Sequence, residues 1–275
     1  MRKILSDISN YVPFARSVIQ ARMSYKVGFF MRIVGGLIQV LIMYYLWLAI
    51  FNSSSSDTIN GFTSSEMIIY VIMSYITAQV INISNEWAIA DDILTGSIAT
   101  NLIKPIRYEK RILSESIGQV VLNICTISIP VWVCFYLYRF IAYKETPPSL
   151  TNILLFLVSA VFGFIIMFLF NFIFSISAFY VTYIWGFMLC KSIVINFFSG
   201  QLIPIVFFPK VMQGILKYLP FSGMNYTPVM IYMGKLSMSE ILFSIGVQVS
   251  WIIILFLLYK LLWSKAIKRV TVMGG

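Results

Sequence analysis

Long apolar runs are the feature that most constrains how this chain can fold. A helix that crosses a bilayer needs about 20 apolar residues, and six such runs occur, at 29–51, 67–84, 117–138, 152–176, 185–203 and 239–262. Strands of a membrane β-barrel are shorter, at about 10 residues, and alternate apolar with polar positions. These runs are apolar on all sides. They predict an all-α polytopic membrane protein with six transmembrane helices in one domain over residues 1–275.

Composition supports this class and excludes others. The chain is 60% hydrophobic and 11% charged, whereas a soluble domain is about 25% charged, so a soluble enzyme, a disordered chain and a disulfide scaffold are excluded. The absence of histidine removes a His metal site and a His general base. Cys125, Cys134 and Cys190 lie inside apolar runs without CxxC spacing, so we expect packing residues and no metal site.

The distribution of basic residues predicts the orientation of the spans. Twelve Lys and Arg residues lie before the first run, between the second and third runs, and after the sixth, against five in the other three loops. Basic residues favour the cytoplasmic side, so both termini should be cytoplasmic in the cell membrane. The excess of positive charge then serves topology and contact with anionic membrane lipid. No basic soluble face is evident, so nucleic acid is not an expected partner.

The segment 1–26 reads as an amphipathic helix before the first span. Tyr11, Phe14, Val18, Ala21 and Tyr25 recur at spacings of three and four residues, which places them on one helical stripe. We expect this interfacial helix to lie along the membrane with its apolar stripe in lipid. It would serve as a simple anchor or as an elbow that transmits motion to the spans.

The loop 85–115 reads as two short helices around a break. Asp91 and Asp92 precede Ile93 and Leu94, Gly96 interrupts, Ile98 and Leu102 follow at helical spacing, and Pro105 ends the pattern. The segment is either a solvated loop with its own packing or a cytoplasmic hairpin whose exposed apolar residues dock on a partner.

The segment 204–238 is apolar but repeatedly broken. Pro204, Pro209, Pro220 and Pro228 divide it at short intervals. Broken apolar backbone at membrane depth must pack on protein or line a cavity. We expect a pair of re-entrant half-helices between spans 5 and 6; an external loop lying on the lipid is the alternative.

Two spans carry polar residues at helical spacing. They are Tyr70, Ser74 and Thr77 in the second run and Ser192, Asn196 and Ser199 in the fifth. Such side chains either bond neighbouring helices together or line a translocation path. Lys191 is the one basic residue deep in a span, and it either faces that path or extends to the interface. A path with many hydroxyls and few charges suits an amphipathic cargo.

At three places the chain resembles the permease subunits of type-2 ABC exporters, in the six-span branch with a separately encoded ATPase. The first is Ile93-Leu94-Thr95-Gly96-Ser97-Ile98 with Leu102-Ile103-Lys104-Pro105-Ile106. The second is Ser199-Gly200 with Pro204 and Phe208-Pro209, and the third is Pro220-Phe221 with Tyr226, Pro228 and Gly234. The resemblance covers about residues 15–268. One departure is the uncharged stretch 178–183, where relatives often carry charges.

The resemblance implies a coupling helix in the loop 85–115 that seats in a groove on the ATPase. The implied docking residues are Asp91, Asp92, Ile93, Leu94, Gly96, Ile98, Asn101 and Leu102. It implies an outer gate built from Gly200, Pro204, Phe208, Pro209, Pro220 and Phe221. It also implies two ATPase copies, a second permease that is identical or related, and a path between the permeases lined by spans 2 and 5.

The chain lacks the machinery for ATP hydrolysis. No G-x-x-x-x-G-K-[ST] sequence occurs, so no phosphate-binding loop is expected. We therefore expect no cofactor on this chain, no catalytic residue, and ATP with Mg²⁺ on the partner subunit. The alternatives are an ATP-independent secondary transporter or channel, which should show ionisable residues at mid-span and inverted repeats, and an intramembrane enzyme, for which paired catalytic groups are missing.

Overall fold

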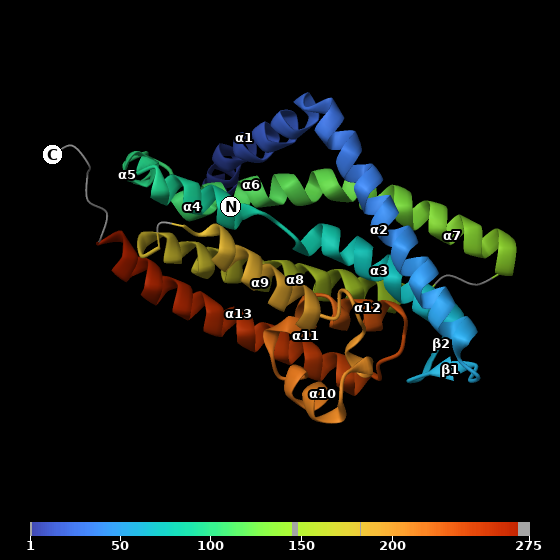
Figure 1. Ribbon diagram of the computed structural model, residues 1–275. Helices are drawn as coiled ribbons and strands as arrows, with labels where there is room; N and C mark the ends of the chain where they lie inside the picture. The colour runs from blue at the N-terminus through green and yellow to red at the C-terminus, as the bar shows by residue number, and fades with distance from the viewer. Residues whose placement is uncertain (1, 145–147, 182, 269–275) are drawn as a thin grey trace.

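Long helices running roughly side by side dominate the computed structural model, which describes residues 2–144, 148–181 and 183–268 (Figure 1). The long helices are α1 (Arg2–Ser24), α2 (Lys26–Ser53), α3 (Ser64–Ile81), α6 (Tyr108–Asn123), α7 (Ile129–Tyr143), α8 (Leu150–Ser175), α9 (Trp185–Phe198) and α13 (Met238–Ile267). The shorter helices are α4 (Asn85–Leu94), α5 (Ser97–Leu102), α10 (Lys210–Leu216), α11 (Pro220–Met224) and α12 (Tyr226–Tyr232).

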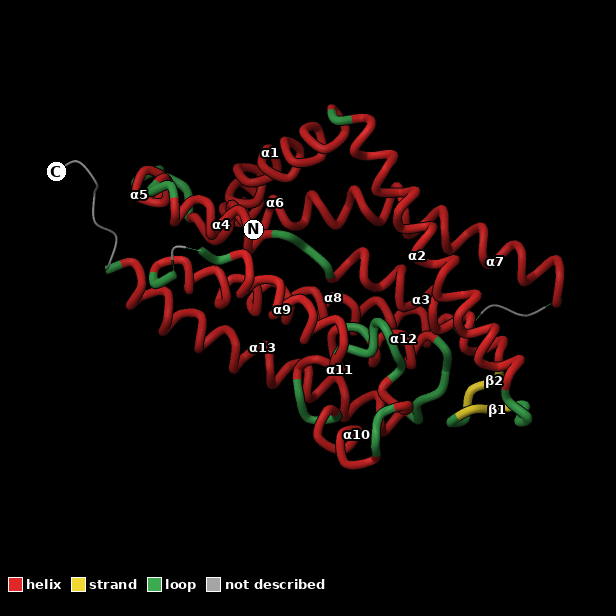
Figure 2. Tube along the Cα trace, in the orientation of Figure 1, coloured by secondary structure: helices red, strands yellow, loops and turns green. Residues whose placement is uncertain are grey.

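The remaining secondary structure among the described residues is three short helical turns and one small β-hairpin. The turns are the π-helical η1 (Ile124–Ser128) and the 3₁₀-helical η2 (Ile176–Phe179) and η3 (Ile205–Phe207). Strands β1 (Thr58–Ile59) and β2 (Phe62–Thr63) pair antiparallel (Figure 2). Their turn, Asn60-Gly61, has positive φ angles of 48° and 78°, the geometry that Asn-Gly favours in hairpins. The sequence analysis did not predict this hairpin, although the Asn-Gly pair signals it.

Five of the predicted spans are confirmed as helical runs that are long and apolar enough to cross a membrane. They are Lys26–Ser53, Ser64–Leu94, Tyr108–Ile141, Leu150–Phe179 and Met238–Ile267. The sixth, α9, has only 14 residues, about 21 Å at 1.5 Å per residue, against a hydrocarbon core of about 30 Å. The predicted run 185–203 is therefore helical only as far as Phe198. The predicted division near residues 177–183 matches the end of α8, with residue 182 outside the described residues.

The two ends of the bundle gather different segments. Figure 1 shows α5 and the last turns of α13 at one end, and the β-hairpin and α10 at the other. We call these the α5 end and the α10 end. At the α10 end, α3 and α13 each begin with a capping box, Thr63 with Glu66 and Ser237 with Glu240, which satisfies backbone N–H groups that a helix start leaves free.

Helix α8 is the centre of the packing. It contacts α3, α4, α11, α12 and α13, and its Ile166 and Phe172 are almost fully buried. Trp263 of α13 stacks on Tyr108 of α6 with ring centroids 5.8 Å apart, which closes the core at the α5 end. By contrast, α2 buries little beyond Trp47 and Phe51, so its apolar surface faces outward, as lipid contact requires.

The third span contains a π turn rather than a break. Helix α6 continues through η1 into α7, which carries Pro130 in its first turn. Proline lacks an N–H donor and crowds the carbonyl four residues earlier. The wider π turn accommodates this defect while the helix continues.

Helix α1 packs on α6, which corrects the prediction that its whole apolar stripe lies in lipid. The backbone of Ala15 sits against Gly118, where any Cβ would clash with it. The Ser114 hydroxyl donates to the Tyr11 carbonyl at 2.6 Å, and Val18 lines a cavity against α6. The last two residues of the stripe, Ala21 and Tyr25, are exposed, with Tyr25 at 78%. Figure 1 shows α1 set at a wide angle to α2, and its role as an anchor or an elbow stays a prediction.

The contact at Gly118 predicts a size-dependent loss of stability. Replacing Gly118 with Leu should push α1 from α6 and lower the free energy of unfolding by about 1–3 kcal/mol, as overpacking does. Thermal unfolding of the purified protein in detergent measures this. The matched control is Gly246→Leu in α13, where a Cβ meets no atom within 4 Å. An equal loss in both variants would contradict the proposed packing.

Candidate functional site

The loop 85–115 folds as a helical hairpin at the α5 end. Helices α4 and α5 meet at Gly96, whose φ of 74° lies in the left-handed region that favours glycine. The Asp92 carboxylate stabilises the bend, since it accepts from the Ser97 hydroxyl at 2.8 Å, the Tyr108 hydroxyl at 2.9 Å and the Arg111 guanidinium at 2.9 Å. Asp92 is therefore an internal support of the hairpin, and Asp91 beside it is exposed.

The exposed apolar residues of the hairpin differ from those predicted. Ile98 is 2% exposed in the main core, so the prediction that it projects toward a partner is wrong. Ile93 and Leu102 are half-buried against the same core. Leu94, at 44%, and Ile103, at 84%, are the large apolar side chains that the hairpin exposes near its bend, and Trp87, at 40%, is exposed in the first turn of α4.

Asn101 is also internal rather than exposed. Its Oδ1 accepts from Lys104 Nζ at 2.7 Å and from Arg111 at 3.1 Å. The physical reason for both corrections is that helical spacing groups residues on one face without saying whether that face points inward.

A polar groove lies beside the hairpin. This cavity, of about 600 Å³, is lined by residues 104–110 with Tyr11, Leu102, Trp263 and Ile267. Three of its lining residues are basic, namely Lys104, Arg107 and Lys110, and Glu109 is acidic. The α5 end thus offers an apolar tip next to a mainly basic groove.

Lys191 of α9 is held in a buried ion pair. Its Nζ lies 3.0 Å from Glu86 Oε1 of α4 and 2.6 Å from Asn171 Oδ1 of α8, and the residue is 4% exposed. It does not extend to the interface in this conformation, so that reading of the sequence is wrong here, while its lining of a path stays a prediction. An ammonium removed from water is tolerated only when it is paired and hydrogen-bonded.

Asn171 completes a three-helix junction. Its Nδ2 donates to the Ile83 carbonyl at 2.9 Å and to Asn85 Oδ1 at 3.0 Å. The junction therefore joins α9, α8 and the start of α4. The sequence analysis missed Glu86 and Asn171; the available signal was an acid directly after the second span and a lone Asn in the apolar run 152–176.

The polar stripe of α3 is buried and paired inside the chain. The Tyr70 hydroxyl donates to the Gly200 carbonyl at 2.6 Å, and the Ser74 hydroxyl donates to the Gln201 carbonyl at 3.2 Å. Asn225 Nδ2 donates to Ser74 Oγ at 2.5 Å. The Thr77 hydroxyl donates a hydrogen bond to the Met73 carbonyl of its own helix. In this conformation these residues act as polar links between segments, and their lining of a path stays a prediction.

The polar stripe of α9 has a different environment. Ser192 and Asn196 are half-buried and Ser199 is buried, with the Ser199 hydroxyl 3.5 Å from the Asn196 carbonyl. Next to Tyr70 and Gln201 lies a cavity of only about 30 Å³, room for about one water molecule. The two stripes meet through the 200–201 turn and do not face each other across open space.

The segment after α9 turns at Gly200 and packs back on the bundle. Gly200 has a φ of 80°, and a Cβ there would lie 3.0 Å from both the Tyr70 hydroxyl and Tyr226 Cβ. The Tyr226 N–H donates to the Ser199 carbonyl at 3.0 Å. This close approach explains why a glycine stands at this turn.

The predicted outer-gate residues cluster around the end of α9. Phe208 packs edge-on against Phe197, with ring centroids 5.0 Å apart, and the ring centroid of Phe221 lies 6.0 Å from that of Phe198. Pro204 and Pro209 precede η3 and α10, and Pro220 begins α11, at positions where a missing N–H costs little. Gln213 donates to the Val206 and Phe208 carbonyls at 2.9 and 2.7 Å. The segment forms four short helical pieces rather than two half-helices, and its gating role stays a prediction.

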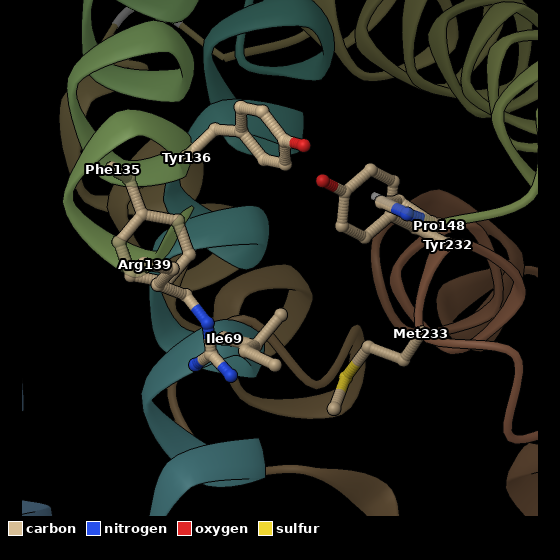
Figure 3. A pocket seen from close by; sticks show the side chains of 7 residues that line it. All are labelled: Ile69, Phe135, Tyr136, Arg139, Pro148, Tyr232 and Met233. Carbon is tan, nitrogen blue, oxygen red and sulfur yellow. The ribbon is translucent and has the colours of Figure 1, made fainter. Parts of the chain in front are cut away.

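A second cavity at the α10 end lies between α3, α7 and α12 (Figure 3). It measures about 180 Å³ and is lined by Ile69, Phe135, Tyr136, Arg139, Pro148, Tyr232 and Met233. Figure 3 shows the hydroxyls of Tyr136 and Tyr232 turned toward each other, and Trp132 donates to the Tyr232 hydroxyl at 2.9 Å. The sequence analysis did not single out this cavity.

The ion pair predicts that substitutions of Glu86 and Lys191 have non-additive effects on stability. Lys191→Met leaves the Glu86 carboxylate buried without its cation, which should cost about 3–5 kcal/mol of stability. The double variant Glu86→Gln, Lys191→Met removes both charges and should recover most of that loss. Thermal unfolding of the two variants measures the coupling, with exposed Lys210→Met as the control. Additive effects would contradict a direct Glu86–Lys191 interaction.

The comparisons with known proteins identify the family. Among the described residues, no group of three or more His, Cys, Asp or Glu side chains is placed to hold a metal ion. A search of curated protein sequences gave no match. The family described as ABC-2 family transporter protein matches residues 37–274. Among the described residues, this range includes four of the five helical runs able to cross a membrane and the greater part of the first, Lys26–Ser53. The chain therefore belongs to the ABC-2 family of membrane transporter proteins.

Proposed function

We propose that this chain is the permease subunit of an ATP-driven exporter, working with a separate ABC ATPase. Membership of the ABC-2 family supports an ATPase partner in general. Two ATPase copies and a second permease, identical or related, would complete the complex, with ATP and Mg²⁺ held by the ATPase. The termini and the hairpin would lie on the cytoplasmic side of the cell membrane.

The observation that carries the proposal is the apolar tip at the α5 end. Leu94 and Ile103 project from a hairpin that is itself braced by Asp92, Arg111 and Tyr108. An exposed apolar pair on a rigid support beside a polar groove is typical of a docking site. We infer that the ATPase receives this tip in an apolar cleft and meets the basic groove with acidic residues.

The junction at Lys191 offers a route from this docking site into the membrane. Helix α4 is one arm of the hairpin, and Glu86 in its first turn is bonded to Lys191 of α9. A nucleotide-driven stroke has an effect only if the ATPase contacts two permease states differently. We infer that movement of the hairpin is passed through Glu86 and Lys191 to α9, and from there to the aromatic cluster around Phe208.

The cargo is proposed to be amphipathic, such as a drug, a peptide or a lipid-like molecule. The polar groups of α3 and α9 that would line a path are hydroxyls and amides, while Lys191 is already neutralised by Glu86. A surface of this kind can bond an uncharged polar group next to an apolar one, and it offers little to a small inorganic ion.

Aspartate at the tip should release the ATPase. Leu94→Asp combined with Ile103→Asp places two charges in the inferred apolar interface, which should weaken association by about tenfold or more. Co-purification of the tagged chain with a co-expressed ABC ATPase measures this directly. The matched control is Ile103→Leu, which keeps an apolar side chain and should retain the ATPase.

The outcome separates the competing functions. Loss of association in the aspartate variant, with an unchanged elution profile of the permease, supports the proposal. If the wild-type chain binds no ATPase, the chain is better described as an ATP-independent transporter or channel. If the ATPase binds both variants equally, docking at Leu94 and Ile103 is wrong.

A further inference from the structure

A polar cavity lies where α1, α4 and α6 meet, away from both the hairpin tip and the α3–α9 contact. It measures about 260 Å³, and its polar lining includes Arg22, Ser84, Asn85, Glu115 and Gln119. A water molecule occupies about 30 Å³ of liquid, so the cavity has room for a group of about eight heavy atoms. Neither the docking site nor the inferred path uses this space.

The cavity lies at the level where lipid headgroups are expected. Arg22 comes four residues before the first span, α2, and Ser84 and Asn85 follow the end of α3. Glu115 and Gln119 lie in the second and third turns of α6. All of these positions are near the ends of spans, at the α5 end of the bundle.

One side of the cavity is built for an anion. Arg22 is half-buried, and its one polar partner among the described residues is the Ser84 hydroxyl, at 3.4 Å. Burial, with the nearby Arg32, lowers the pKa of Arg22, so a negative group there would be stabilised. The cavity also meets the N-terminus of α4, where the helix dipole and free N–H groups favour phosphate.

Asn85 adds a buried polar donor at this end of the cavity. It is 7% exposed, and its Nδ2 has no hydrogen-bond partner within the described part of the chain. A buried donor without a partner costs about 1–3 kcal/mol. This nitrogen is inaccessible to water in the conformation described, so an acceptor in the cavity would satisfy it only after the side chain turns toward the cavity.

The other side of the cavity is acidic. Glu115 lies on α6, with Arg111 Nε at 3.4 Å from its Oε1. Arg111 is shared with Asp92, so Glu115 is only partly neutralised by it. The cavity therefore offers a cation and amide donors to one end of a ligand and a carboxylate to the other.

We propose that this cavity binds the phosphoethanolamine headgroup of a membrane phospholipid. The phosphate would lie on Arg22, Asn85 Nδ2 and the start of α4, and the primary ammonium would lie on Glu115. A headgroup without a cation would meet the only partly neutralised carboxylate of Glu115, and a quaternary ammonium cannot donate hydrogen bonds to it. This explains why a zwitterionic headgroup with a primary amine fits better than an anionic one. The inference does not depend on ATP coupling.

Native mass spectrometry tests the site. The purified full-length chain is released from nanodiscs that contain phosphatidylethanolamine, phosphatidylglycerol and phosphatidylcholine, and the bound lipids are counted. Wild type should retain phosphatidylethanolamine in preference to the other two. Arg22→Met should reduce this retention about tenfold, as expected for loss of charge-assisted bonds. Lys26→Met, which removes an exposed cation at the same level outside the cavity, should behave as wild type.

Further variants keep the test decisive. Glu115→Gln should remove the preference for phosphatidylethanolamine over phosphatidylglycerol while phosphate binding persists. If Arg22→Met does not fold, this variant alone tests whether the headgroup binds in the cavity. Equal retention by wild type and Arg22→Met would overturn the site. No preference among the three lipids in wild type would overturn the role of Glu115. Displacement of the lipid by added inorganic phosphate would show a site for a soluble anion instead.

Discussion

The burial of the Lys191 ammonium is the constraint around which the α5 end of this protein is organised. A charge in an apolar span must be paired, since its desolvation would otherwise cost several kcal/mol. Glu86 and Asn171 supply the partners, and they come from two other helices. The position of α9 is thereby tied to α4 and to the central helix α8. Because α4 is one arm of the exposed hairpin, the proposed docking surface and the membrane core share one junction.

The α10 end solves a different problem, that of broken backbone in an apolar setting. Non-helical segments inside a membrane need partners for their N–H and C=O groups. Gln213, Tyr70 and Ser74 supply such partners to the chain between residues 200 and 208. Many of the polar residues that stand out in the sequence are therefore used internally. The side chains that remain exposed on the surface are mainly apolar. They include those of α2 and the tip residues Leu94 and Ile103.

The sequence predicted the features that depend on local chemistry. Run length identified five spans, Gly96 marked the bend of the hairpin, and the proline spacing marked the broken segment. It failed where a residue's environment is decided by distant segments. Spacing grouped Ile98 with Leu102 but did not show that α5 turns Ile98 into the core. Lys191 stood out as a lone charge, yet its partners come from positions 86 and 171, which no periodic pattern connects. The stop of α9 at Phe198 likewise depends on the close approach of Gly200 to Tyr70 and Tyr226.

We infer that the junction of Lys191, Glu86 and Asn171 carries movement of the hairpin to the segment 204–238. A distance measurement between spin labels at exposed Thr100 of α5 and exposed Val211 of α10 tests it most directly, in a background where the three native cysteines are replaced. In the complex with its ATPase, addition of ATP should shift the distance distribution, and the variant Glu86→Gln, Lys191→Met should abolish that shift while the ATPase stays bound. An ATP-dependent shift that survives in this variant would contradict the claim.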